Sequence, residues 1–186
     1  MKQSVEQHPP KGILDRAALA LSTFGVGYMP IAPGTFGSMV GVIIYLGVTW
    51  AAANVGIAMI ERGFLAEQAS AWILLVNLTL LTLFTLAGIW AATRSTRFFG
   101  NADPSHAVVD EVIGQLVTFL FVPFGISWKL ILAGFLLFRL FDIWKPYPID
   151  DLQNLPLGLG VCADDLLAGI YAGICLAFIY AVSITI

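Results

Sequence analysis

The sequence contains two pairs of adjacent carboxylates and one single aspartate that could act together. They are Asp110-Glu111, Asp164-Asp165 and Asp142. Adjacent carboxylates repel one another, so each pair needs a cation beside it, or one member must hold a proton. Oxygen-rich sites of this kind suit Mg²⁺, Ca²⁺ or Mn²⁺, and zinc is disfavoured because no Cys/His cluster has its ligand spacing. We predict that these side chains are both the metal ligands and the catalytic groups.

Asp142 lies between two basic residues at helical spacing. Arg139, Asp142 and Lys145 follow one another at intervals of three, which places them on one face of a helix. One interpretation is a ladder of ion pairs at the membrane interface. The other is that Arg139 and Lys145 bind the phosphates of a substrate, Arg as a planar fork and Lys as a point charge.

A turn rich in Pro and Gly over residues 30–38 precedes the first long apolar run. Thr35 or Ser38 is a candidate N-cap for the helix that follows. Backbone N–H groups at a helix N-terminus bind phosphate well, although the Gly-Lys-Ser/Thr ending of a P-loop is missing here. We predict that the turn contacts a substrate phosphate through Gly34, Thr35, Gly37 and Ser38.

His106 stands four residues before Asp110, so the two side chains could meet on one helical turn. A histidine at a helix start is more often a cap or a supporting group than a catalyst. We therefore do not assign His106 to the catalytic set.

Long apolar runs must position these residues. The chain has 186 residues, of which 59% are hydrophobic and 11% charged, whereas a soluble domain carries roughly 25% charged residues. A membrane span needs about 20 mostly apolar residues, and residues 39–60 and 71–92 meet this need without a single charge. The backbone must satisfy its own hydrogen bonds in lipid, so these runs are predicted to be helices.

The predicted fold is all-α, a polytopic membrane helix bundle with about five transmembrane helices. Two of them are the runs just named, and the others start near His106, Trp128 and Asp164. Residues 12–28 are expected to form a short interfacial or re-entrant helix. The whole chain, residues 1–186, is predicted to be one domain with a mobile tail over residues 1–11.

Five crossings would bring all the carboxylates named above to one side of the membrane. The same side would carry seven basic residues and the opposite side only Arg62 and Lys129. The positive-inside rule then places the site in the cytoplasm. The net charge of −3 argues against non-specific nucleic-acid binding.

A divalent cation, a phosphate-binding turn and cationic side chains at one membrane face together favour phosphoryl chemistry on a lipid. A second interpretation is an ion- or proton-coupled carrier, because intramembrane carboxylates also line ion pathways. A carrier would place its carboxylates near the midplane, often between inverted repeats, and no internal repeat is visible. A non-catalytic scaffold would leave the acidic pairs unexplained.

Four stretches of the sequence resemble the phosphatidylglycerophosphatase A family of bacterial membrane lipid phosphatases. They occur in the family's order and the resemblance covers roughly residues 13–180. The matching stretches are residues 30–38 (PIAPGTFGS), 108–115 (VVDEVIGQ), 138–149 (FRLFDIWKPYPI) and 158–169 (GLGVCADDLLAG). One departure is Asp150-Asp151, where a basic residue is expected in relatives.

The resemblance implies removal of the terminal phosphate from phosphatidylglycerophosphate, with Mg²⁺ as cofactor and a phospholipid in the membrane as partner. The products would be phosphatidylglycerol and phosphate. It also implies location in the bacterial inner membrane. It leaves open which carboxylate is the base, whether one or two metal ions bind, and whether water or a side chain attacks.

Overall fold

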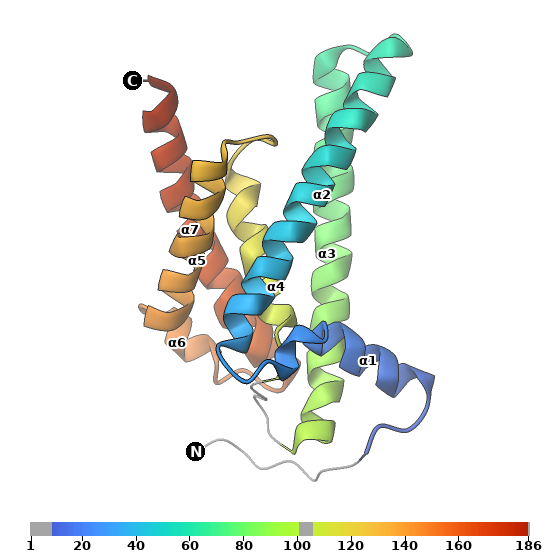
Figure 1. Ribbon diagram of the computed structural model, residues 1–186, viewed down its shortest axis with the longest axis vertical. Coiled ribbons are helices and arrows are strands. Elements are labelled where there is room, and N and C mark those ends of the chain that lie inside the picture. Colours follow the sequence, from blue (N-terminus) through green and yellow to red (C-terminus); the bar gives the residue numbers. More distant parts are fainter. Residues whose placement is uncertain (1–8, 101–105, 186) are drawn as a thin grey trace.

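The computed structural model describes residues 9–100 and 106–185, so residues 1–8 of the predicted tail lie outside it (Figure 1). The described residues form helices and contain no strand, which confirms the all-α prediction. Two of these helices are short 3₁₀ turns, Val26–Tyr28 and Phe119–Phe121. The helices are α1 (Ile13–Thr23), α2 (Pro33–Glu61), α3 (Ala66–Phe99), α4 (Val109–Thr118), α5 (Trp128–Trp144), α6 (Ile149–Leu152) and α7 (Gly158–Thr185).

Three of these helices, α2, α3 and α7, are long and apolar enough to cross a membrane. Their sides are mostly exposed, as expected for helices that face lipid rather than other protein. The helices α4 and α5 have 10 and 17 residues, fewer than the roughly 20 that a full span needs. The count of five transmembrane helices therefore stays a prediction.

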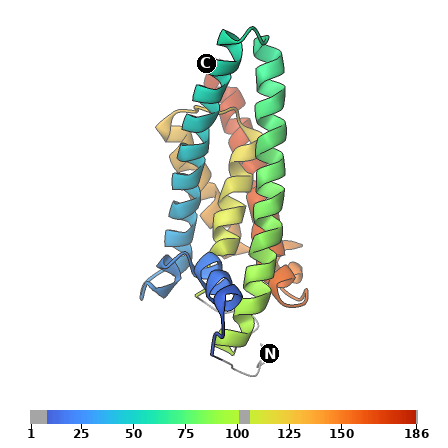
Figure 2. The ribbon, with the colours of Figure 1, turned by 90° about the vertical axis from the view of Figure 1, so that its right-hand side faces the viewer.

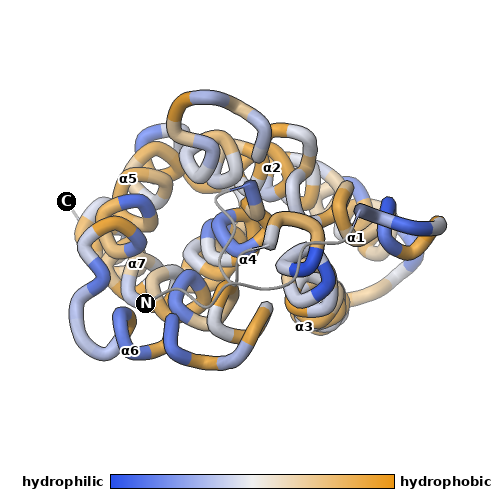
Figure 3. The backbone as a smooth tube through the Cα atoms, turned by 90° about the horizontal axis from the view of Figure 1, so that it is seen from below, coloured by the Kyte–Doolittle hydropathy of each residue, from blue (hydrophilic) through white to orange (hydrophobic). Residues whose placement is uncertain are grey.

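The short helix α4 occupies the centre of the bundle. It packs against α2, α3, α5 and α7, which surround it when the molecule is seen from below (Figure 3). Its buried residues include the apolar Val109, Val112 and Ile113 and the polar Gln115 and Thr118. A helix enclosed by other helices can carry polar groups that lipid would not tolerate, which explains why this segment is not a clean apolar run.

Glycines allow the neighbouring helices to approach α4 closely. A Cβ added to Gly169 of α7 would overlap the carbonyl of Gly114 on α4, and one added to Gly37 of α2 would lie 2.9 Å from Val108 Cβ. Small residues at such crossings are the usual means by which membrane helices pack backbone against backbone. These contacts determine how near the polar side chains of α2, α4 and α7 come to one another.

The helix ends that carry the predicted site all lie at one end of the bundle. There α2, α4 and α7 begin and α3 and α5 end, while the α2–α3 hairpin forms the opposite end (Figures 1 and 2). Helix α1 lies across the first end, in the direction expected of an interfacial helix rather than a span (Figure 1).

An ion pair and a hydrogen bond hold α1 in place. The Nε of Arg94 on α3 donates to Asp15 Oδ1 at 2.5 Å, and the backbone N–H of Lys11 donates to Asp15 Oδ2 at 2.6 Å. The hydrogen bond from Arg94 lowers the pKa of Asp15 below its usual value. Behind the pair, Ala18 and Ser22 are fully buried, whereas Ile13 is 85% exposed on the outer face of α1.

The N-cap prediction for the 30–38 turn was wrong. Helix α2 begins at Pro33, after Ala32 in a left-handed conformation (φ 49°), and no side chain caps it. Pro is favoured at the first helical position because its missing N–H has no helical partner there. Thr35 and Ser38 therefore lie inside the helix, and Ser38 Oγ donates to the carbonyl of Gly34 at 3.0 Å.

Candidate active site

Three of the five predicted carboxylates come together at the junction of α4 and α7. Asp110 and Glu111 lie in the first turn of α4, and Asp165 lies in the second turn of α7. One carboxylate oxygen from each residue lies within 4.8 Å of the others. Carboxylate oxygens gathered this closely could hold a hard divalent cation such as Mg²⁺, which prefers oxygen ligands.

The electrostatics of the cluster also fit a cation. Asp110 Oδ1, Glu111 Oε2 and Asp164 Oδ1 are buried and accept no hydrogen bond from the described residues. Asp165 is only 3% exposed. Buried carboxylates without donors are unfavourable unless a positive charge compensates them, so the donor set fits a divalent metal ion bound between Asp110, Glu111 and Asp165.

The two predicted cations each pair with one of the remaining aspartates. Arg139 Nη1 donates to Asp142 Oδ2 at 2.5 Å, on the same face of α5. Lys145 Nζ donates to Asp164 Oδ2 at 2.6 Å, which joins the end of α5 to α7. Of the predicted ladder, the Arg139–Asp142 pair lies on α5, whereas Lys145 follows the last residue of α5 and pairs with α7 instead. A bound phosphate could replace the carboxylates as the partner of both cations.

The start of α2 lies against this cluster, although it is more than 70 residues away in sequence. A Cβ added to Gly34 would overlap Glu111 Oε1 and would lie 3.2 Å from Arg139 Nη1. The same Arg139 nitrogen is 3.5 Å from Ser38 Oγ. Gly34 and Ser38 are thus brought to the site by the α2–α4 contact.

The other two residues predicted in this segment are placed differently. The N–H of Thr35 donates to the carbonyl of Ala32 at 3.0 Å, so this group is already used within the helix start. Gly37 packs against Val108, where it serves the contact between α2 and α4. A role for Thr35 and Gly37 in binding phosphate stays a prediction.

His106 does not lie on the same helical turn as Asp110. It precedes α4, which begins at Val109, and its Nδ1 is 3.0 Å from the carbonyl oxygen of Gly27. The imidazole ring lies near the rings of Tyr28 and Phe99, at 5.5 and 5.1 Å between centroids. The histidine thus joins the turn after α1 to the end of α3.

One polar residue near the site was missed in the sequence. Gln115 is fully buried on α4, and neither atom of its amide has a hydrogen-bond partner among the described residues. It stands one helical turn after Glu111, on the same face. The sequence did offer a signal for Gln115, because it is a polar residue in an apolar run four positions after a candidate ligand.

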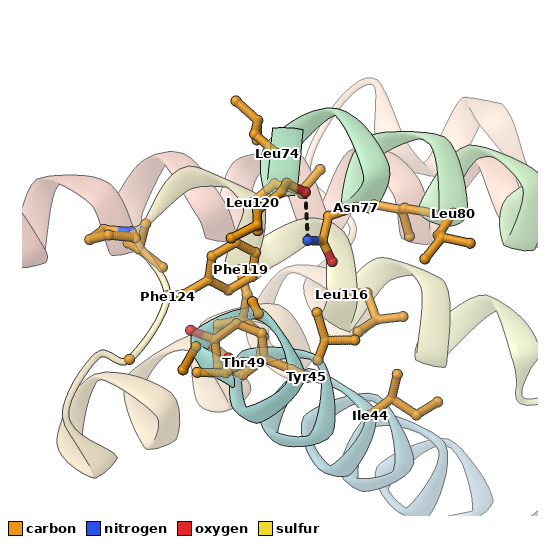
Figure 4. A pocket seen from close by; sticks show the side chains of 18 of the residues that line it. Ile44, Tyr45, Thr49, Leu74, Asn77, Leu80, Leu116, Phe119, Leu120 and Phe124 are labelled. Carbon is orange, nitrogen blue, oxygen red and sulfur yellow. Dashed lines mark hydrogen bonds between the residues drawn. The ribbon is translucent and has the colours of Figure 1, made fainter. Parts of the chain in front are cut away.

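A cleft of about 780 Å³ lies away from the carboxylates, between α2, α3 and the end of α4 (Figure 4). Its walls are mainly apolar, with Tyr45, Leu80 and Phe119 among the lining residues. Asn77 also lines it, but its Nδ2 donates to the carbonyl of Ile73 in its own helix at 2.8 Å. No predicted site residue lines this cleft in the described part of the chain.

The fold and the site define a helical membrane protein with a carboxylate-rich, cation-bordered centre at one end of its bundle. The chain matches the model of the phosphatidylglycerophosphatase A family over residues 19–180, and it belongs to that family. The protein is therefore an enzyme, a phosphatase of the lipid phosphatase class, and its apolar helices fit a membrane location.

Three relatives match over most of their length. A protein of Bacteroides thetaiotaomicron named putative phosphatidylinositol-3-phosphatase is 38% identical over 83% of this chain and 87% of its own. A phosphatidylglycerophosphatase A of Haemophilus influenzae is 33% identical over 90% and 91%. That of Escherichia coli is 29% identical over 84% and 78%. No solved structure matches the chain significantly.

Proposed function

We propose that this protein hydrolyses the terminal phosphate of phosphatidylglycerophosphate in a Mg²⁺-dependent reaction of phospholipid biosynthesis. The products are phosphatidylglycerol and inorganic phosphate. The family supports the activity, and the observation that carries the metal dependence is the group of carboxylate oxygens from Asp110, Glu111 and Asp165 within 4.8 Å of one another.

Asp110, Glu111 and Asp165 would hold the metal ion, which when bound would neutralise phosphate charge and polarise the phosphorus–oxygen bonds. Arg139 and Lys145 leave their aspartate partners and bind the remaining phosphate oxygens. Ser38 lies beside Arg139 and completes the polar wall. Asp142 and Asp164, the other two predicted carboxylates, hold the cations until phosphate binds, and the segment containing Gly34, Thr35, Gly37 and Ser38 lines the phosphate.

The reaction needs one water molecule and returns one proton to the leaving group. The water oxygen forms a bond to phosphorus as the bond between phosphorus and the glycerol oxygen breaks. A buried carboxylate accepts the proton of the water, and the leaving alkoxide takes up a proton to become the free hydroxyl of phosphatidylglycerol. Positioning and charge stabilisation account for most of the catalysis expected in phosphoryl transfer.

The position of the site suits a lipid substrate. The site lies where α2, α4 and α7 begin, and α1 lies across the same end with Ile13 exposed. A lipid phosphate lies at the membrane interface, so the acyl chains can stay in the bilayer while phosphate leaves to water. The basic residues at this end favour the cytoplasmic face of the bacterial inner membrane.

A phosphorylated inositol lipid is a second candidate substrate because of the name of one relative. The protein named putative phosphatidylinositol-3-phosphatase shares 38% identity with this chain, more than the two relatives named phosphatidylglycerophosphatase A that are compared above. Both substrates present a terminal phosphate monoester on a polar group of a membrane lipid. A carrier is disfavoured, since the carboxylates stand near helix ends rather than at mid-helix.

Phosphate release from the purified protein in detergent micelles tests the proposal. Phosphatidylglycerophosphate, phosphatidylinositol 3-phosphate and phosphatidic acid are compared at equal surface fractions, each with Mg²⁺ and with excess EDTA. We expect the highest kcat/KM for phosphatidylglycerophosphate and loss of activity in EDTA that added Mg²⁺ restores. A preference for the inositol lipid would transfer the assignment to that substrate, and full activity in EDTA would exclude the metal site.

A further inference from the structure

Two buried polar groups beside the active site lack partners, and their chemistry is complementary. Gln115 is fully buried, and neither its Oε1 nor its Nε2 has a hydrogen-bond partner among the described residues. Arg139 Nε is also buried without a partner there. A guanidinium Nε–H needs an acceptor, and an amide oxygen is one. Leaving both of these groups without a hydrogen bond in a low-dielectric interior is unfavourable.

The contacts of α2 place the two groups along one side of that helix, about one turn apart. A Cβ added to Gly41 would lie 2.8 Å from Gln115 Cβ. Ser38, about one turn earlier on the same helix, has its Oγ 3.5 Å from Arg139 Nη1. Gln115 and Arg139 therefore face successive turns of one α2 surface.

The contact between α4 and α5 lies next to both residues in the chain. The ring of Phe138 lies against Gly114, so that its Cζ would be 2.7 Å from a Cβ added there. Phe138 and Gly114 are the chain neighbours of Arg139 and Gln115. Gln115 and Arg139 are thus each next in the chain to a residue of the α4–α5 contact.

We propose that Gln115 is a positioning residue for Arg139, an inference that rests on the proposed function. When phosphate is bound and the guanidinium leaves Asp142, Gln115 Oε1 accepts a hydrogen bond from Arg139 Nε. That bond leaves the terminal nitrogens of the fork free to bind two phosphate oxygens. Gln115 itself acts through Arg139 and does not touch the phosphorus.

Binding of inorganic phosphate to the purified protein in detergent with Mg²⁺, measured by isothermal titration, tests this role. Gln115→Met keeps the size and removes the acceptor, whereas Gln115→Glu keeps an acceptor oxygen. We expect about tenfold weaker phosphate binding for Gln115→Met, the effect of losing one hydrogen bond to a charged group. Gln115→Glu should recover most of this loss. Thr118→Val is the control, because Thr118 is equally buried but its hydroxyl already donates to the Gly114 carbonyl at 3.0 Å.

A double-mutant cycle separates positioning from a general packing defect. In an Arg139→Ala background, Gln115→Met should weaken phosphate binding no further. An equal loss in both backgrounds, no loss in either, or no phosphate binding by the unsubstituted protein would overturn the inference. If Gln115→Met does not fold, Gln115→Asn, which withdraws the acceptor by one methylene, is compared in the same two backgrounds.

The lipid assay distinguishes this inference from the proposed function. Gln115→Met should raise KM for the lipid more than it lowers kcat, a change that a loosened fold would not produce selectively. If the unsubstituted protein hydrolyses none of the phosphatidylglycerophosphate but the phosphate-binding cycle holds, the proposed substrate is wrong and the positioning role stands.

Discussion

At the scale of single residues, the site contains more buried carboxylates than cationic side chains. Asp142 and Asp164 have Arg139 and Lys145 as partners, at 2.5 and 2.6 Å. Asp110, Glu111 and Asp165 converge, and no lysine or arginine among the described residues forms an ion pair with them. The five acids therefore divide into three that could bind a metal ion and two that pair with Arg139 and Lys145.

Removing a carboxylate from the group of three should abolish most activity without unfolding the protein. Asp165→Asn is nearly isosteric and removes one negative ligand, so we expect kcat/KM to fall by about 100-fold or more. Phosphate release from the lipid and the Mg²⁺ concentration for half-maximal rate are the measurements. Asp151→Asn is the matched control, because Asp151 is an exposed acid at the same end of the bundle. A similar loss in both variants would contradict the metal assignment.

Arg139 and lysine should not be interchangeable at this position. Lysine keeps the charge but loses the planar fork that can bind two phosphate oxygens. We expect Arg139→Lys to lower kcat/KM about tenfold, close to 1.4 kcal/mol of transition-state stabilisation. Lipid kinetics check this value. Unchanged kinetics in Arg139→Lys, or in Arg139→Ala, would remove Arg139 from the phosphate site.

At the scale of elements, the site depends on how closely α2 and α7 approach α4. Gly169 lies against the carbonyl of Gly114, and Gly34 lies against the Glu111 carboxylate. Each of these contacts brings residues distant in sequence to the start of α4. A side chain at either glycine would push the helices apart, although it would leave the charged residues themselves unaltered.

Bulk at the crossing of α4 and α7 should therefore cost activity and stability together. We expect Gly169→Val to displace Asp165 from Asp110 and to destabilise the fold by about 1–3 kcal/mol, as overpacking usually does. Thermal unfolding in detergent and phosphate release are measured in parallel. Gly47→Val on α2 is the control, because a Cβ at Gly47 meets nothing within 4 Å. Wild-type behaviour of Gly169→Val would show that the crossing is not a constraint.

The attachment of α1 should depend on the ionisation of Asp15. Its folded-state pKa lies below the usual 3.8 because Arg94 donates to the carboxylate. The stabilising effect is thus complete at neutral pH and is lost as the pH falls below 3.8 through the folded value. Asp15→Asn should remove it at every pH, and hydrogen exchange of the α1 amides at pH 7 should rise. Glu67→Gln, at the opposite end of α3, should leave that exchange unchanged.

At the scale of the whole molecule, one end carries the chemistry and the other carries the α2–α3 hairpin (Figure 1). If the bundle spans the membrane, Asp151 and Glu67 must face opposite compartments. Both residues are exposed. Single cysteines at these positions, in a Cys175→Ala background that leaves the buried Cys162, can be labelled with an impermeant thiol reagent.

In intact spheroplasts we expect the cysteine at position 67 to react and that at position 151 to be protected. In inverted membrane vesicles the pattern should reverse. Labelling of both cysteines from one side would refute the proposed sidedness and the single bilayer-spanning bundle together. Labelling at 151 from outside and 67 from inside would keep the bundle but place the site on the outer face.

The sequence alone was enough for the class of fold, the candidate carboxylates and the family. Long uncharged runs must be helices in lipid, because the backbone has no other hydrogen-bond partners there, and α2, α3 and α7 follow those runs. Acidic pairs are conspicuous against a composition that is 59% hydrophobic. The motifs containing them were recognisable without coordinates. Apolar runs and acidic motifs can both be read from the sequence because each is a property of a short segment.

Only the tertiary structure decided which acids lack a cationic partner among the described residues, and that Gln115 is fully buried with no hydrogen-bond partner there. The pairing of Lys145 with Asp164 joins two helices, and the approach of Gly34 to Glu111 joins segments over 70 residues apart. The start of α2 was also mispredicted from the sequence, since the helix begins at Pro33 without a side-chain cap. Hydropathy describes whether a single residue favours water or an apolar environment. The ion pair and the close helix approach follow instead from the packing of one helix against another.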